Sequence, residues 1–171
     1  MPRRWSVILA IVVVSVVAAL MLANVQLQYR YVAPRKSEFN LLFKYGVAAM
    51  NELDTFNNTY TKDLVMNPPI TTGLYLSDEE IGRIAQKMVD IDFFNYPESF
   101  PPSTERFLTP STEYYLKVQN GTMVKEVSWN SNSQLTGSLE DGLLQLVNCI
   151  TDIVEQRPEY KALPPPMGGY C

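Results

Sequence analysis

The sequence predicts an α+β domain that follows one N-terminal transmembrane helix. Residues 5–23 contain no charged side chain, and a helix of this length spans roughly the 30 Å hydrocarbon core of a bilayer. Beyond this run, alternating apolar and polar residues indicate strands, and two segments repeat apolar residues at helical spacing. Their order, β-β-α-β-β-α, is typical of an antiparallel sheet with two helices on one face.

The first 27 residues have two interpretations. Arg3 and Arg4 precede the apolar run, as in a secretory signal peptide, whose apolar region is usually about 7–15 residues long. The longer run here, and the poor match of residues 21–23 to a small-residue cleavage site, favour an uncleaved signal anchor over residues 5–27. Cleavage near Ala23 would instead release a secreted soluble factor, such as an inhibitor.

Orientation follows from the lengths of the two flanks. Basic residues stand on both sides of the apolar run, so the charge rule is nearly balanced. The short tail of residues 1–4 and the long remainder predict a single-pass protein of the cell membrane. Its N-terminus would be cytoplasmic and its C-terminal domain extracytoplasmic, and its first partner would be the lipid bilayer around residues 5–27.

The charge balance excludes some partner classes. The chain has 14 Lys and Arg and 18 Asp and Glu, and only Arg3 and Arg4 lie before residue 28. The remainder is therefore acidic, which argues against nucleic acid and anionic lipid as its partners.

The two cysteines leave two alternatives open. Cys149 lies on a predicted helix and Cys171 is the last residue. An oxidising compartment would permit a disulfide between them, because the segment that separates them is rich in proline and glycine and could fold back. The alternative is two unpaired thiols.

The first half of the domain begins after a polar stalk at residues 28–37. Residues 39–47 alternate with period two, as in a half-buried strand. Residues 51–64 are β-branched and aromatic with polar alternates, and we expect one or two strands with a turn at 57–58. The stretch Asn67-Pro68-Pro69 is predicted to end this strand.

A helix is the clearest local prediction. A short strand at residues 71–76 leads to Ser77 and Glu80, which have the spacing of a capping box. Behind them, apolar residues up to Ile91 recur at helical spacing and predict an amphipathic helix that lies on the sheet. Residues 93–97 close it.

A long proline-containing segment, residues 98–111, follows the helix. Irregular stretches of this length tend to be functional or mobile. Its aromatic residues supply contact area for a partner, and the alternative is that the rings pack back onto the sheet as a lid. The candidate binding residues are Phe100 and Phe107 in this segment and Phe94 and Tyr96, which directly precede it.

A hairpin and a second helix complete the predicted domain, residues 38–166. Strands at 112–119 and 122–129 flank Asn120-Gly121, a strong hairpin turn, so that Leu116 would pair with Lys125. Ser138 to Asp141 resembles a weaker capping box for a helix that stops at Arg157-Pro158. Residues 167–171 are expected to be a flexible tail.

The residue inventory excludes common catalytic chemistry. The chain has no histidine, which removes Ser–His and Cys–His pairs and the commonest zinc ligand. We therefore expect no cofactor, no metal site and no catalysis. A carboxylate-dependent envelope enzyme that uses Asp90, Asp92 or Glu98 stays as an alternative, although solvated side chains explain Asp90 and Asp92 more simply.

Four short runs resemble a set of extracytoplasmic proteins of Gram-positive bacteria that have a domain of unknown function. The runs are Leu-Ser-x-x-Glu at 76–80, Ile-Asp-Phe-Phe-Asn-Tyr-Pro at 91–97, Tyr-Tyr-Leu at 114–116 and Val-Ser-Trp at 127–129. The resemblance covers roughly residues 39–166. It implies a membrane-anchored envelope location and this fold, and it implies no activity. Together with the residues, it favours a non-catalytic module that binds a protein partner in the envelope.

Overall fold

A computed structural model describes residues 15–16, 38–105, 107–135 and 137–170. The predicted N-terminal tail, the stalk and all but two residues of the predicted transmembrane anchor lie outside these ranges. Within them, no helix has both the length and the apolar character needed to cross a membrane.

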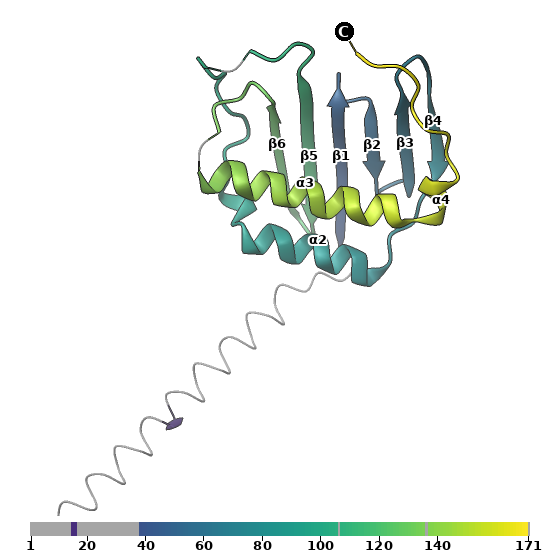
Figure 1. Ribbon diagram of the computed structural model, residues 1–171. Helices are drawn as coiled ribbons and strands as arrows, with labels where there is room; N and C mark the ends of the chain where they lie inside the picture. The colour runs from purple at the N-terminus through teal and green to yellow at the C-terminus, as the bar shows by residue number, and fades with distance from the viewer. Residues whose placement is uncertain (1–14, 17–37, 106, 136, 171) are drawn as a thin grey trace, which may run out of the picture. The chain divides into compact units, whose positions relative to one another are not determined.

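The fold is α+β, as predicted, with a six-stranded antiparallel sheet in the order β4-β3-β2-β1-β5-β6. Helices α2 and α3 lie on one face of this sheet (Figure 1). The strands are β1 (Phe39–Val47), β2 (Asn51–Asp54), β3 (Thr59–Leu64), β4 (Asn67–Gly73), β5 (Thr112–Asn120) and β6 (Met123–Asn130). The helices are α2 (Asp78–Asp90), the 3₁₀ helix η1 (Phe93–Asn95), α3 (Ser138–Gln156) and α4 (Pro158–Lys161).

Strand β1 lies in the middle of the sheet, and its alternation explains the core. Phe39, Leu41 and Phe43 are fully buried beneath the helices, while the residues between them lie on the opposite face. The strand pairs with β2 on one side and along its whole length with β5 on the other. Burial of one face of β1 therefore fixes the register of both halves of the domain.

Strand β4 corrects the sequence interpretation of the first half. We expected Pro68 and Pro69 to end the preceding strand, but both residues belong to β4, which pairs with β3. Proline is tolerated there because β4 is an edge strand, where one side of the ladder needs no donor. The order of elements is thus β-β-β-β-α-β-β-α rather than β-β-α-β-β-α.

The hairpin between β5 and β6 differs from the predicted register. Leu116 pairs with Val127 rather than with Lys125, and Asn120 pairs with Met123. The two central residues of the turn are 121 and 122 rather than the predicted 120 and 121. Gly121 alone has a positive φ there, 58°, as in a hairpin turn whose first central residue is glycine. This register sets two buried apolar side chains opposite each other, Leu116 and Val127.

The two helices begin differently. At α2 the predicted capping box is present: Glu80 N donates to Ser77 Oγ at 3.2 Å, and Ser77 N donates to Glu80 Oε2 at 2.7 Å. The second predicted box is wrong, since Gly137 is the N-cap of α3 and no side chain caps it. Glu80 also forms an ion pair with Arg157 at 3.4 Å, which links the start of α2 to the end of α3.

The C-terminal segment lies against the sheet. Met167 N donates to Leu64 O at 3.2 Å, and the Tyr170 hydroxyl donates to Asp63 Oδ2 at 2.6 Å. The other Asp63 oxygen accepts from Val65 N at 2.9 Å. Val65 has φ of 64°, a strained value for a β-branched residue, and these neighbours hold it.

Replacement of Glu80 should separate its two roles. Glu80→Ala removes both the cap and the ion pair and should lower the free energy of unfolding by about 1–2 kcal/mol. Glu80→Gln keeps the cap geometry and should cost less than about 1 kcal/mol. Urea unfolding followed by tryptophan fluorescence measures both, and equal losses would refute the capping role.

A buried tyrosine and a partly buried one predict an alkaline limit to stability. Tyr45 and Tyr60 share a hydrogen bond of 2.7 Å between their hydroxyls. Burial raises the pKa of Tyr45 to about 12 and raises that of Tyr60 further. Because both pKa values exceed the unfolded value near 10, the folded state keeps its protons while the unfolded state loses them.

Stability should therefore be complete below pH 10 and fall between pH 10 and 12, by about 1.4 kcal/mol per pH unit for each tyrosine. Unfolding measured across this range should show a shallower decline in a Tyr45→Phe, Tyr60→Phe variant. An unchanged slope in that variant would contradict the assignment.

Candidate functional site

The structure separates the four predicted aromatic residues. Phe94 and Phe100 pack against the core, and Tyr96 is only 8% exposed. Phe107 is 83% exposed. The segment thus combines the two alternatives that the sequence left open: three rings pack inward, and one ring faces solvent.

The segment after η1 covers the edge of the sheet. Ser128 N donates to Glu98 O at 2.8 Å, Ser103 N donates to Asn132 O at 2.6 Å, and Gln134 N donates to Pro101 O at 2.7 Å. These bonds satisfy backbone groups along β6 and the turn that follows it. They shield an edge that would otherwise be open to pairing.

Asn132 holds the exposed end of this segment, which we call the 107–108 tip (Phe107 and Leu108). Leu108 N donates to Asn132 Oδ1 at 2.7 Å, and Asn132 Nδ2 donates to Leu108 O at 3.0 Å. The amide of Asn132 thereby occupies both backbone groups of Leu108, as a neighbouring strand would. The backbone beside Phe107 is therefore fixed, although its ring is in solvent.

The turn that contains Asn132 is itself well connected. Asn132 N donates to Asn130 Oδ1 at 2.9 Å, and Asn130 N donates to Ser133 Oγ at 2.9 Å. Ser133 is buried. The tip is thus connected through one side chain to the rigid end of β6.

Next to the tip lies a depression of about 360 Å³, which we call the apolar hollow. Tyr114 and Trp129 line it and stack on each other, with ring centroids 4.9 Å apart and an angle of 11° between planes. Leu144, on α3, is 57% exposed. The lining residues are Leu108, Thr112, Tyr114, Trp129, Asn130, Ser131, Leu135, Glu140, Leu143, Leu144 and Val147.

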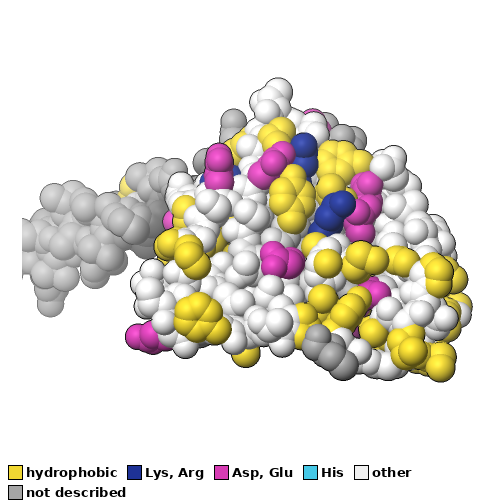
Figure 2. Space-filling view, turned by 90° about the horizontal axis from the view of Figure 1, so that it is seen from above, with side chains coloured by type: hydrophobic (Ala, Val, Ile, Leu, Met, Phe, Trp, Pro, Cys, Tyr) yellow, Lys and Arg dark blue, Asp and Glu magenta, His cyan; other side chains and the backbone are white. Residues whose placement is uncertain are grey.

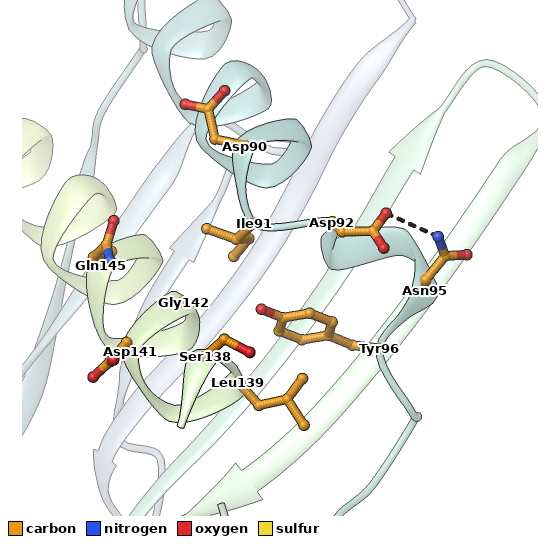
Figure 3. Close-up of a pocket in the computed structure, with 10 residues that line it drawn as sticks. All are labelled: Asp90, Ile91, Asp92, Asn95, Tyr96, Ser138, Leu139, Asp141, Gly142 and Gln145. Atoms are coloured by element: carbon orange, nitrogen blue, oxygen red, sulfur yellow. Dashed lines mark hydrogen bonds between the residues drawn. The ribbon is translucent and has the colours of Figure 1, made fainter. Parts of the chain in front are cut away.

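A second depression, of about 620 Å³, lies where the end of α2 and η1 meet the start of α3. Asp90, Asp92 and Asp141 are among its lining residues, but Figure 3 shows their carboxylates pointing in different directions rather than toward one point. Asn95 Nδ2 donates to Asp92 Oδ1 at 2.8 Å. Among the residues that the structure describes, no cluster of carboxylates and cysteines is placed to hold a metal ion.

Tyr96 and Gly142 form the contact that closes this second depression. Figure 3 shows the Tyr96 ring between η1 and the first turn of α3. A Cβ at position 142 would lie 2.5 Å from the Tyr96 hydroxyl, so glycine is needed for this approach. Burial, and then the charge of Asp92, raise the pKa of Tyr96.

The remaining predicted residues lie elsewhere. Glu98 is exposed and is not among the residues that line the second depression. Cys149 has a free thiol on α3, and burial raises its pKa. Cys171 lies outside the described residues.

Opposite charges are paired on the sheet face that the helices leave open. Lys44 and Glu52 are 2.8 Å apart across β1 and β2, and Lys117 and Glu126 are 3.1 Å apart across β5 and β6. Figure 2, seen from above, shows a different side of the domain, where exposed hydrophobic side chains have charged groups of both signs among them. The paired face has the character of a solvated surface rather than of an apolar docking site.

No family model matches the chain, and no curated protein is similar to it.

Loss of the Asn132 amide should loosen the tip without unfolding the domain. In Asn132→Ala, hydrogen exchange at the Leu108 amide should accelerate by about fivefold, because its acceptor is removed and one net hydrogen bond is worth about 1 kcal/mol. The matched control is Asn57→Ala, which removes the bond from Asn57 Nδ2 to Asp54 Oδ2 in another turn. Exchange at Leu108 that is equally fast in both variants would contradict the role of Asn132 in holding Leu108.

Proposed function

We propose that this protein is a single-pass, membrane-anchored extracytoplasmic module that binds a protein partner and does not catalyse a reaction. The anchor is residues 5–27, with the N-terminus cytoplasmic, and the binding domain is residues 38–166. The proposal of an anchor depends on the uncharged run in the sequence. The proposal of binding is carried by one observation: Phe107 is exposed, and the next residue, Leu108, is held by Asn132 and lines an apolar hollow.

Such an arrangement has the character of a protein-binding site. Interfaces concentrate their energy in aromatic anchors and in the pockets that receive them. An anchor that is already held in place loses less conformational freedom on binding. The hydrogen bonds of Asn132 to Leu108 supply this restraint, and the stacked Tyr114 and Trp129 supply a rigid apolar wall.

The test is crosslinking in intact cells of the full chain with Phe107→Asp, Leu108→Asp against wild type. Both side chains are exposed, so the variant should fold and should lose the crosslinked complexes. The matched control is Met123→Asp, Val124→Asp, two exposed residues of β6, which should keep them. Complexes that survive the first variant would refute the site.

The anchor has its own test. Alkaline extraction of membranes should leave the full-length chain in the pellet. Recovery of a shortened chain in the medium, with a new N-terminus near Ala23, would instead establish the secreted factor as the better proposal.

The carboxylate-dependent enzyme keeps one supporting observation. Asp90 and Asp92 line the same depression as Asp141. A catalytic acid and base must both lie within hydrogen-bond distance of the reacting group. The carboxylates point in different directions in Figure 3, which favours solvated side chains. A folded Asp90→Asn, Asp92→Asn, Glu98→Gln variant that fails to restore the function lost on deletion of the gene would support the proposal of an enzyme.

A further inference from the structure

The second depression contains a buried polar group that the fold itself does not use. Tyr96 lines it and is only 8% exposed, and Figure 3 shows the hydroxyl end of its ring turned away from η1 and toward α3. Among the residues that the structure describes, none forms a hydrogen bond with this hydroxyl. Buried polar side chains normally have a partner, and this one faces a cavity of about 620 Å³, a usual size for a small-molecule site.

The charge of the lining selects the kind of ligand. Asp90, Asp92 and Asp141 line the depression, and no lysine or arginine is among its described lining residues. Lys87, which donates to Gln145 Oε1 at 3.4 Å, offsets one of these three negative charges. A cavity lined by charge of one sign attracts ligands of the opposite sign, so the depression favours a cation.

The positions of the aspartates point the same way. Asp90 is the last residue of α2 and Asp92 follows two residues later, at the helix end where the macrodipole is negative and a carboxylate is unfavourable. Asp141 lies instead in the first turn of α3, where a carboxylate stabilises the helix. Helix stability thus explains Asp141 but not Asp90 and Asp92, whereas a cation beside them would be attracted by both carboxylates and by the end of α2.

The geometry suits an extended ligand rather than a single ion. The carboxylates point in different directions in Figure 3, and the described residues offer no cluster that could hold a metal ion. An amide orients each carboxylate near α2: Gln86 Nε2 donates to Asp90 Oδ1, and Asn95 Nδ2 donates to Asp92 Oδ1, both at 2.8 Å. Carboxylates that are held apart in this way are reached best by a chain that carries several ammonium groups.

We propose that the second depression binds a linear di- or polyamine. One ammonium group donates to the Tyr96 hydroxyl and the others donate to the aspartate carboxylates. The methylene chain between them lies on Ile91 and Leu139, which supply apolar lining. The site is separate from the proposed protein-binding surface, because the second depression and the apolar hollow share no lining residue.

Isothermal titration calorimetry of the purified full chain with spermidine tests the site. Spermidine should bind, and its affinity should fall as salt is added. Tyr96→Phe should weaken binding by about tenfold or more, because a hydrogen bond to a charged group is lost. The matched control is Tyr170→Phe, which removes a hydroxyl that donates to Asp63, a residue outside the lining, and should leave the affinity unchanged.

Urea unfolding of the same variants shows whether the Tyr96 hydroxyl serves the fold. Tyr96→Phe keeps the ring and breaks no hydrogen bond between described residues, so its midpoint should be no lower than that of the wild type. Tyr170→Phe loses its bond to Asp63 and should unfold at a lower urea concentration. A lower midpoint for Tyr96→Phe would mean that its hydroxyl supports the fold, and would count against the site.

Three calorimetric results would overturn the proposal: no binding of spermidine, equal affinity in the wild type and Tyr96→Phe, or equal loss in both tyrosine variants. Binding of Mg²⁺ as tight as that of spermidine, at matched ionic strength, would show only a general attraction of cations. Binding of a tetralysine peptide but not of spermidine would assign the depression to a basic protein segment instead. None of these results changes the crosslinking expected at Phe107, so the two proposals stand or fall separately.

Discussion

The exposed position of Phe107 depends on one side-chain amide. Asn132 donates to the carbonyl of Leu108 and accepts from its N–H. Without these bonds, the backbone of a long irregular segment would be free to turn the ring inward or to sample many positions. With them, the backbone of Leu108 is held at the wall of the apolar hollow, and the Phe107 ring stays in solvent.

The fold explains how Asn132 is positioned beside Leu108. Burial of alternate residues of β1 beneath α2 and α3 fixes the register of β5, and β5 fixes β6. Asn132 follows β6 directly, and the Asn130–Ser133 turn holds it. The start of α3 supplies the opposite wall of the hollow. A surface feature formed by two residues thus depends on the central strand, although it lies at the edge of the domain.

Local patterns in the sequence predicted local structure well. The alternation in β1 and the capping box of α2 are repeated in the structure, because each depends on residues within a few positions of one another. The predicted register of the hairpin was wrong. Two neighbouring turns were possible, and burial of Leu116 and Val127, several residues away from the turn, decides between them. The prolines of β4 were misjudged because edge position cannot be read from a single strand.

The site was only partly predictable, because it too depends on contacts between residues that are distant in the sequence. The aromatic segment was singled out, but its division into three packed rings and one exposed ring depends on contacts with distant elements, among them the start of α3 and the turn after β6. No local signal links Asn132 to Leu108, which are separated by 24 positions. An asparagine in a polar turn looks like any other turn residue until the segment that it holds lies beside it.

Hydroxyl-radical footprinting of Phe107 tests the central claim most directly, because it compares the same ring in the purified chain and in intact cells. The account predicts strong oxidation of Phe107 in the purified chain at low concentration and marked protection in cells, with oxidation of Val124 similar in both. Protection in the dilute purified chain, or equal oxidation of Phe107 in both states, would contradict it.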